Sequence, residues 1–294
     1  MQPLKIGKYS FDWGSRTHVM GILNITPDSF SGDGLLVADG WLEASLEQAR
    51  RFVAAGVDIL DIGGESTRPG SQAVEAETEK GRVIPVIEKI KEEFSDTLIS
   101  IDTYKASVAD EALQAGAQIV NDVWGLRADP GLAQVVARHK AVVILMHNRS
   151  KPVHAQVQAN LGGRYIGMEY DDLLKDVSNE LLGSVDLAVQ AGIPTRNIIL
   201  DPGIGFGKTV EQNLELLNRL DEIRELGYPI LLGPSRKSFI GYTLNLTPDQ
   251  RLEGTAAAIA VGIVRGADIV RVHDVEFMLR VARMTDAIVR KRNN

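Results

Sequence analysis

The sequence predicts an α/β protein of the (β/α)8 barrel class, and three observations lead to this prediction. In a recurring pattern, a glycine follows a helical stretch, a short apolar run comes next, and a polar residue ends the run. The pattern occurs with equal spacing from Gly56 to Asp61, from Gly116 to Asn121 and from Gly266 to Arg271, and in a longer form over residues 190–203. Eight apolar runs alternate with eight amphipathic stretches, and no change in composition divides the 294 residues. We therefore expect a single barrel domain over residues 1–294.

Each part of the repeated pattern has a physical reason. Glycine is the usual residue just after a helix, because it adopts the left-handed conformation without steric cost. A run of Ile, Val and Leu is typical of a parallel strand that is buried on both faces. The polar residue then lies at the carboxyl end of the strand, which is where α/β proteins bind ligands.

The apolar runs and the amphipathic stretches give the expected order of elements. Strands are expected at 17–24, 57–62, 97–102, 118–122, 141–146, 197–201, 229–233 and 268–272. Helices are expected near 39–55, 75–94, 105–115, 130–139, 171–191, 210–226, 249–265 and 274–291. An open sheet with six or seven strands is the alternative, because the sequence does not show whether the sheet closes.

Three connections are longer than usual for this fold class. Residues 25–38 and 63–74 are rich in Gly, Ser, Thr and Pro and follow the first two strands, while residues 147–170 follow the fifth. Long loops after barrel strands usually cover the active site. We interpret the first two as mobile lids with glycine hinges; ordinary surface loops are the alternative.

Composition excludes several classes of protein. Apolar residues make up 44% and charged residues 24%, as in a globular protein with a large core. There is no apolar run of membrane-spanning length and no signal-peptide core at the N-terminus, so we expect a cytoplasmic protein without membrane contact. The absence of Cys excludes disulfides, thiolate metal sites and a Cys nucleophile. The net charge of −7 argues against nucleic acid as a partner.

Polar residues gather at or just after the predicted strand ends. They are Asn24, Asp61, Asp102, Asn121, Asp122, Asp201, Ser235, Lys237, Arg271 and His273. Any one of them could be a solvated strand end or a helix cap. Closure of a barrel would bring all of them to one face, where carboxylates and carboxamides would lie beside basic groups.

The members of this set suit two kinds of ligand group. Asp102, Asn121 and Asp201 can accept and donate hydrogen bonds to a flat, nitrogen-rich heterocycle. A second group, Lys237, Arg271 and His273, can hold phosphate oxygens. The amide oxygen of Asn24 is of the kind that Mg²⁺ accepts. Two simpler interpretations remain open: Asp122 could only hydrogen-bond a neighbouring loop, and His273 could be a packed or capping histidine.

Two motifs do not support the chemistry that they resemble. Residues 203–209, GIGFGKT, are similar to a phosphate-binding loop, but Pro202 stands where that motif requires glycine. We expect this glycine run to let the backbone approach a ligand, with Phe206 presenting an aromatic surface. The five histidines lack the paired spacing of a zinc site.

Eight segments in order resemble the dihydropteroate synthase family. They are MGILNITPDSFSGDG (20–34), DILDIGGESTRPG (58–70), SIDTYK (100–105), IVNDVWG (119–125), LMH (145–147), LDPGIGFGK (200–208), GPSRKSFIG (233–241) and IVRVHDV (269–275). The resemblance implies a (β/α)8 barrel, usually a homodimer. It further implies an enzyme of folate biosynthesis that joins 6-hydroxymethyl-7,8-dihydropterin diphosphate to p-aminobenzoate and releases diphosphate.

The resemblance also implies roles for residues at the matching positions. The pterin ring would be held by Asp102, Asn121, Asp201 and Lys237 between Met146 and Phe206, with Thr67 nearby. The diphosphate would be held by Asn24, Arg271 and His273, with Mg²⁺ bound through Asn24. The p-aminobenzoate, which sulfonamides mimic, would be bound by Thr67, Arg68, Pro69 and Ser235. Of these, Lys237, Arg271, His273 and Arg68 would be the catalytic residues. Family members use an SN1-like path in which diphosphate leaves first and the arylamine attacks a pterin cation.

The sequence departs from the family pattern in few places. Asp33 lies one position along from the usual aspartate, and its role is open. We assign no catalytic role to residues 147–170 and interpret Arg149 and Lys151 as solvated charges. The apolar stripe of the last helix, with Met284 and Ile288 among its members, is expected to pack on the barrel, with a subunit interface as the alternative. A corrinoid-dependent methyltransferase domain and a non-catalytic pterin-binding paralogue are the alternatives for function.

Overall fold

Eight parallel strands form the centre of the structure, which is a computed structural model. It describes residues 1–26, 40–66, 71, 73–158, 160–166 and 169–290. The strands are β3 (His18–Asn24), β4 (Ile59–Gly63), β5 (Leu98–Asp102), β6 (Ile119–Asp122), β7 (Val142–Met146), β10 (Ile198–Asp201), β11 (Leu231–Leu232) and β12 (Ile269–Val272). Each one overlaps a predicted strand.

The sheet closes into a barrel. The hydrogen-bonded order is β10-β7-β6-β5-β4-β3-β12-β11, so each strand lies beside its neighbours in the sequence. The two ends of this order meet at a parallel bridge between Leu200 and Ile230, where the Leu200 amide donates to the Pro229 carbonyl at 2.9 Å. This bridge excludes the open sheet and confirms the predicted fold class.

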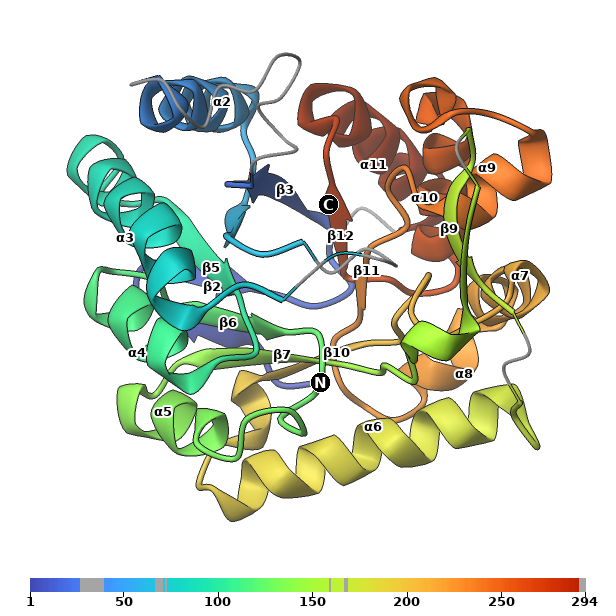
Figure 1. The fold of residues 1–294 in the computed structure, drawn as a ribbon, viewed down its shortest axis with the longest axis horizontal. Coiled ribbons are helices and arrows are strands. Elements are labelled where there is room, and N and C mark those ends of the chain that lie inside the picture. The colour runs from blue at the N-terminus through green and yellow to red at the C-terminus, as the bar shows by residue number, and fades with distance from the viewer. Residues whose placement is uncertain (27–39, 67–70, 72, 159, 167–168, 291–294) are drawn as a thin grey trace.

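Helices surround the barrel on its outer side (Figure 1). They are α2 (Trp41–Ala55), α3 (Ala76–Glu93), α4 (Ala106–Gln114), α5 (Leu132–His139), α6 (Leu173–Gln190), α7 (Val210–Asn218), α8 (Leu220–Arg224), α10 (Leu252–Val264) and α11 (Val275–Val289). The helix predicted over 210–226 is two helices, because the backbone leaves the helical conformation at Arg219 (φ −112°, ψ 26°). A further helix, α9 (Ser238–Leu244), was not predicted.

The glycines of the repeated pattern end helices as expected. Gly56 follows α2 with φ 92°, and its amide donates to the Phe52 and Val53 carbonyls. Gly116 and Gly266 have φ values of 117° and 102°. These φ values are strained for any residue with a side chain, so glycine is required at each of the three helix ends. The repeated spacing from glycine to polar residue therefore reflects the same turn from helix to strand in each case.

The barrel interior is apolar at its N-terminal end. Side chains that point inward from the strands, such as Ile59, Leu98 and Ile199, form one buried cluster with the N-terminal hairpin. That hairpin consists of β1 (Leu4–Ile6) and β2 (Tyr9–Phe11) and was not predicted. Because side chains alternate along a strand, the residue two positions further on also points inward. In the described part of the chain, the hairpin and this apolar cluster fill the N-terminal end, so a ligand would enter from the carboxyl end.

Residues 147–170, predicted as a loop, contain a short helical turn and a hairpin. The hairpin pairs β8 (Ala155–Gln158) with β9 (Gly162–Tyr165). It lies against α9, where the Tyr242 hydroxyl donates to the Gly162 carbonyl at 3.2 Å and the Arg164 guanidinium lies 4.5 Å from the Tyr242 ring centroid. The segment is therefore an ordered attachment to the barrel.

The described residues include no helix long and apolar enough to cross a membrane. Most of the proposed first lid, and residues 67–70 and 72 of the second, lie outside the described residues.

Candidate active site

Polar side chains replace apolar ones at the carboxyl end of the barrel. Counting two positions onward from the inward-pointing apolar layer leads from Ile59 to Asp61, from Ile119 to Asn121, from Ile199 to Asp201 and from Ile269 to Arg271. The register places Asn24 of β3 opposite Gly63, Gly63 opposite Asp102, and Asp102 opposite Asn121. The register thus places Asn24, Asp102 and Asn121 at one level across neighbouring strands, while Asp61 lies opposite Ser100, two residues earlier.

Arg271 links two carboxylates of this set across the barrel. Its Nε donates to Asp61 Oδ2 and its Nη2 to Asp102 Oδ2, both at 2.5 Å. Asn121 Nδ2 donates to the same Asp61 oxygen at 3.2 Å. Asp61 was predicted among the polar residues that barrel closure brings to one face, but no ligand role was assigned to it; it is the third residue of β4, is completely buried and binds Arg271. The alternation from Ile59 was the signal that could have revealed it.

The charges in this cluster do not balance, since two carboxylates face one guanidinium. Burial raises the pKa of Asp102 to about 7, against the attraction of Arg271, and the neighbouring Asp61 carboxylate adds to the rise. The pKa of Arg271 is raised because both carboxylates favour its charged form over the cost of burial. Arg271 therefore stays charged, with N–H groups that neither carboxylate uses.

Asp201 and Lys237 form the opposite wall. Asp201 lies opposite Met146 in the register of β10 and β7, and its Oδ1 accepts from the Gly203 amide at 2.7 Å. Lys237 donates to the Ile204 carbonyl, and its ammonium lies 4.5 Å from the Phe206 ring centroid. Burial raises the pKa of Asp201 and lowers that of Lys237 to about 8. Four of the predicted pterin contacts thus share this wall, namely Asp201, Lys237, Met146 and Phe206, whereas Asp102 and Asn121 lie in the Arg271 cluster.

Ser235 and His273 contact each other at the mouth of the site. The Ser235 hydroxyl lies 3.0 Å from His273 Nδ1 and accepts from the His273 amide at 3.2 Å. Arg236, between Ser235 and Lys237, has a left-handed φ of 55° and pairs outward with Asp274. This backbone conformation costs about 1 kcal/mol or more. It turns Arg236 away, while the residues on both sides of it contact the site.

Other predictions have mixed outcomes. Asp122 accepts from the Trp124 and Leu126 amides at 2.8 and 2.5 Å, which confirms its interpretation as a loop anchor. The interpretation of Arg149 as a solvated charge is wrong, because its Nε donates to Glu180 at 2.6 Å. Thr67, Arg68, Pro69 and Asp33 lie outside the described residues, so their predicted roles stay predictions.

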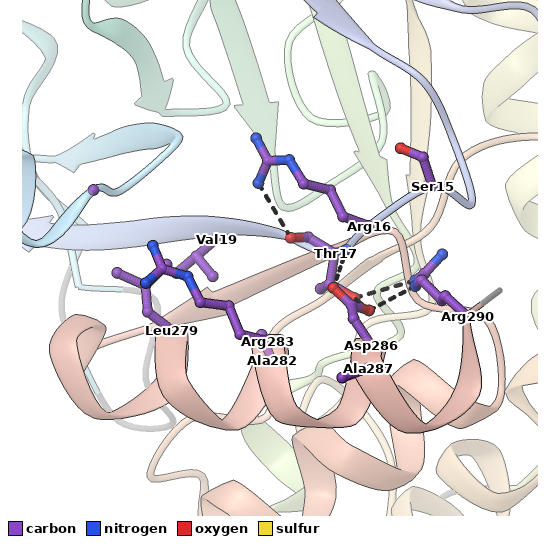
Figure 2. A pocket seen from close by; sticks show the side chains of 11 residues that line it. Ser15, Arg16, Thr17, Val19, Leu279, Ala282, Arg283, Asp286, Ala287 and Arg290 are labelled. Carbon is purple, nitrogen blue, oxygen red and sulfur yellow. Dashed lines mark hydrogen bonds and ion pairs between the residues drawn. The ribbon is translucent and has the colours of Figure 1, made fainter. Parts of the chain in front are cut away.

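A cavity of about 330 Å³ lies at the other end of the barrel, between the start of β3 and α11 (Figure 2). Its only carboxylate, Asp286, already accepts from the Thr17 amide at 2.7 Å and from Arg290 Nε at 2.6 Å. None of the predicted site residues lines it. This cavity is therefore not the site that the sequence predicts.

Comparison with known proteins identifies the family of the chain. A family model described as pterin-binding enzyme matches residues 20–273, which include every described residue of the site. The chain belongs to the pterin-binding enzyme family. Within this family it is similar to the dihydropteroate synthases of Clostridium beijerinckii (49% identical over 98% of this chain and 100% of that protein) and of Bacillus subtilis (49%, over 96% and 92%).

Solved structures of other pterin-binding enzymes agree with this assignment. Dihydropteroate synthase from Clostridium difficile, determined with pteroic acid, has a TM-score of 0.86 and 51% identity over 96% of this chain and 100% of that one. The Yersinia pestis enzyme with a sulfonamide drug has a TM-score of 0.87 and 38% identity, over 98% and 99%. The Xanthomonas albilineans enzyme with 4-aminobenzoic acid has a TM-score of 0.84 and 39% identity, over 95% of this chain and 94% of that one. The chain is thus a transferase of the dihydropteroate synthase group.

Proposed function

We propose that this protein joins 6-hydroxymethyl-7,8-dihydropterin diphosphate to p-aminobenzoate and releases 7,8-dihydropteroate and diphosphate. The observation that carries the proposal is the juxtaposition of Arg271 with Asp61, Asp102 and Asn121 at the open end of the barrel. One half of this cluster suits a heterocycle and the other suits an anion. The related structures determined with pteroic acid and with 4-aminobenzoic acid support the same substrates here.

The pterin is proposed to lie between the two walls of the site. Buried carboxylates accept the paired N–H groups of such a ring, as Asp102 and Asp201 would, and Asn121 can both donate and accept. Lys237 would donate to an acceptor of the ring. Met146 and the half-buried Phe206 would contact its faces.

The diphosphate is proposed to lie against Arg271, His273 and Asn24. Only two N–H groups of Arg271 are used by Asp61 and Asp102, so others remain for phosphate oxygens. Among the residues with described positions, no group of three His, Cys, Asp or Glu side chains could hold a metal. One amide oxygen at Asn24 fits Mg²⁺ that arrives with the substrate, since Mg²⁺ keeps several waters and binds phosphate oxygens. When bound, Mg²⁺ would neutralise negative charge on the leaving diphosphate.

The proposed reaction breaks the C–O bond before the C–N bond forms. The bonding electrons leave with diphosphate, and Arg271 and His273 would stabilise the growing negative charge. Asp102 and Asp201 would stabilise the positive pterin fragment. The amine of p-aminobenzoate, held beside Ser235 and the predicted Thr67, Arg68 and Pro69, would then attack the carbon. The resulting arylammonium is acidic enough to lose its extra proton to water, so no strong base is needed.

The protein is also proposed to form a homodimer, as the family resemblance implies. The apolar stripe of α11 is only partly covered by the barrel: Val275 and Met278 are buried, whereas Met284 and Ile288 are 64% and 70% exposed. Val264 on the adjacent α10 is 59% exposed. These residues form an apolar outer surface suited to a second copy, and sedimentation equilibrium would measure the oligomeric state.

The proposed reaction is tested by mixing the purified protein with the pterin diphosphate, Mg²⁺ and p-aminobenzoate. We expect dihydropteroate and diphosphate in equal amounts, and competitive inhibition by a sulfonamide against p-aminobenzoate. Pterin binding without product would instead identify a non-catalytic paralogue. Transfer of a methyl group to a corrinoid would favour the methyltransferase alternative.

The pH profile of kcat/KM for the pterin diphosphate is expected to be bell-shaped. The raised pKa of Asp102, about 7, means that this carboxylate is protonated below pH 7 and accepts N–H groups poorly. The lowered pKa of Lys237, about 8, means that its positive charge is lost above pH 8. The profile between pH 5.5 and 9.5 checks this, because kcat/KM reports groups of the free enzyme. The variant Asp102→Asn distinguishes titration of the enzyme from titration of the substrate. It should remove the part of the acid limb that Asp102 contributes and leave the part due to Asp201, whose pKa is also raised; an unchanged limb would contradict the assignment.

A further inference from the structure

We infer that Lys208 is a positioning residue, which holds the loop between β10 and α7 in the shape that presents Phe206 and Ile204 to Lys237. The inference rests on the proposed function for the meaning of that wall. Lys208 belongs to the GIGFGKT segment, which resembles a phosphate-binding loop, but its side chain is buried and donates to carbonyls of its own loop. The residue is only 2% exposed. Such burial is rare for a lysine, because removing its charge from water costs free energy.

All three hydrogens of the Lys208 ammonium have partners inside the protein. Nζ lies 2.9 Å from His147 Nδ1, and it donates to the Gly203 carbonyl at 3.0 Å and to the Phe206 carbonyl at 3.1 Å. Across the described residues, no carboxylate forms an ion pair with it; burial lowers the pKa of Lys208 to about 7, against the attraction of the Asp201 carboxylate. Two of the three acceptors are backbone carbonyls of its own loop, so the loop is folded around the ammonium.

The backbone of this loop has little intrinsic preference for its shape. Gly203, Gly205 and Gly207 all have left-handed φ values, of 72°, 83° and 60°. Three such residues in five leave the unfolded segment unusually free, and fixing them requires specific contacts. The bonds to Lys208 close the loop from within. Two hydrogen bonds hold its outer side: the Gly205 amide donates to Asn213 Oδ1 at 2.6 Å, and the Tyr170 hydroxyl donates to the Gly207 carbonyl at 2.8 Å.

The same loop forms the wall on which Lys237 lies. The Ile204 carbonyl accepts from Lys237, and the Phe206 ring lies under its ammonium. A Cβ on Gly205 would come within 2.8 Å of Lys237 Cδ, so the loop backbone is in direct contact with the lysine. A shift of the Gly203 and Phe206 carbonyls would therefore displace both the aromatic wall and the resting contact of Lys237.

His147 completes the support from the neighbouring loop. Its Nδ1 must be unprotonated to accept from Lys208, and burial together with the Lys208 charge lowers its pKa to about 4, so it is neutral. Its Nε2 then carries the proton and faces Glu180 Oε2 at 3.2 Å, a separation suited to electrostatic attraction although the atoms are not aligned as a hydrogen bond. Glu180 in turn binds Arg149. Lys208 is thus held by the loop after β7 as well as by its own loop.

The test compares Lys208→Met and His147→Leu with Lys91→Met. Lys91 is a matched control, because its ammonium also donates to loop carbonyls, of Ser95 at 2.6 Å and Thr97 at 3.4 Å, but before β5 at the other end of the barrel. Hydrogen–deuterium exchange of the ligand-free proteins reports on residues 202–209, and fluorescence titration with pteroic acid reports on binding. KM values for both substrates complete the comparison.

We expect Lys208→Met to accelerate exchange over residues 202–209 and to weaken pteroic acid binding and raise the pterin diphosphate KM about tenfold, roughly what loss of one charged hydrogen bond produces. The KM for p-aminobenzoate should change less than twofold. His147→Leu should act in the same direction more weakly, and it decides the question if Lys208→Met does not fold.

Exchange over 202–209 equal to that of Lys91→Met, or faster exchange with unchanged pterin affinity, would overturn the inference. If the wild-type protein forms no dihydropteroate, the proposed function fails, whereas the exchange comparison still decides whether Lys208 holds the loop.

Discussion

Arg271→Met is expected to lower kcat/KM by about 10³-fold or more. Arg271 is placed to stabilise the leaving diphosphate, and removal of one such preorganised donor typically costs 10²–10³-fold. The same change leaves Asp61 and Asp102 facing each other without a cation. Their repulsion should raise the pKa of Asp102 further and weaken its interaction with the pterin cation. Steady-state kinetics with both substrates measure the loss.

The Arg271→Met variant should also be less stable, with a free energy of unfolding lower by roughly 3 kcal/mol. This value is the lower part of the range for a broken buried ion pair, because one fifth of the arginine side chain is exposed. The double variant Arg271→Met with Asp61→Asn is the control. It removes one of the unpaired carboxylates, so the free energy of unfolding should recover in part while turnover stays low. Recovery of turnover in the double variant, or a single variant within tenfold of wild type, would contradict the role in catalysis.

The barrel and most of its polar layer could be predicted because local rules determine them. The left-handed turn at Gly56 and the buried run after it depend only on neighbouring residues, and strand alternation then fixes which side chains point inward. Asp102, Asn121 and Asp201 follow from this pattern. Asp61 was undervalued because it was counted as a strand end, whereas β4 continues to Gly63.

Features that depend on contacts distant in sequence could not be predicted. The Leu4–Ile6 and Tyr9–Phe11 strands are only three residues each and are stabilised by the barrel interior that they cover. Helix α9 contains glycine, aromatic and β-branched residues, which have weak helix propensity, and tertiary packing decides its conformation. The burial of Lys208 depends on His147, which is 61 residues away.

Lys237→Ala is expected to lower kcat/KM for the pterin diphosphate by about 10²-fold, chiefly through a higher KM. The ammonium lies between the Ile204 carbonyl and the Phe206 ring, at the wall proposed to hold the pterin. Its positive charge also opposes the burial that raises the pKa of Asp201. Arg236→Ala is the matched control, because Arg236 is the adjacent basic residue but pairs with Asp274 outside the site.

The effect on Asp201 gives this variant a signature that simple loss of a contact would not produce. Without Lys237, burial is less opposed and the pKa of Asp201 should rise further. The carboxylate then becomes protonated at higher pH, so pteroic acid binding should begin to weaken at a higher pH than in the wild type. Fluorescence titrations from pH 5.5 to 9 measure the shift. An acid limb at the wild-type position, with affinity lowered equally at all pH values, would mean that Lys237 acts only as a hydrogen-bond donor to the ring.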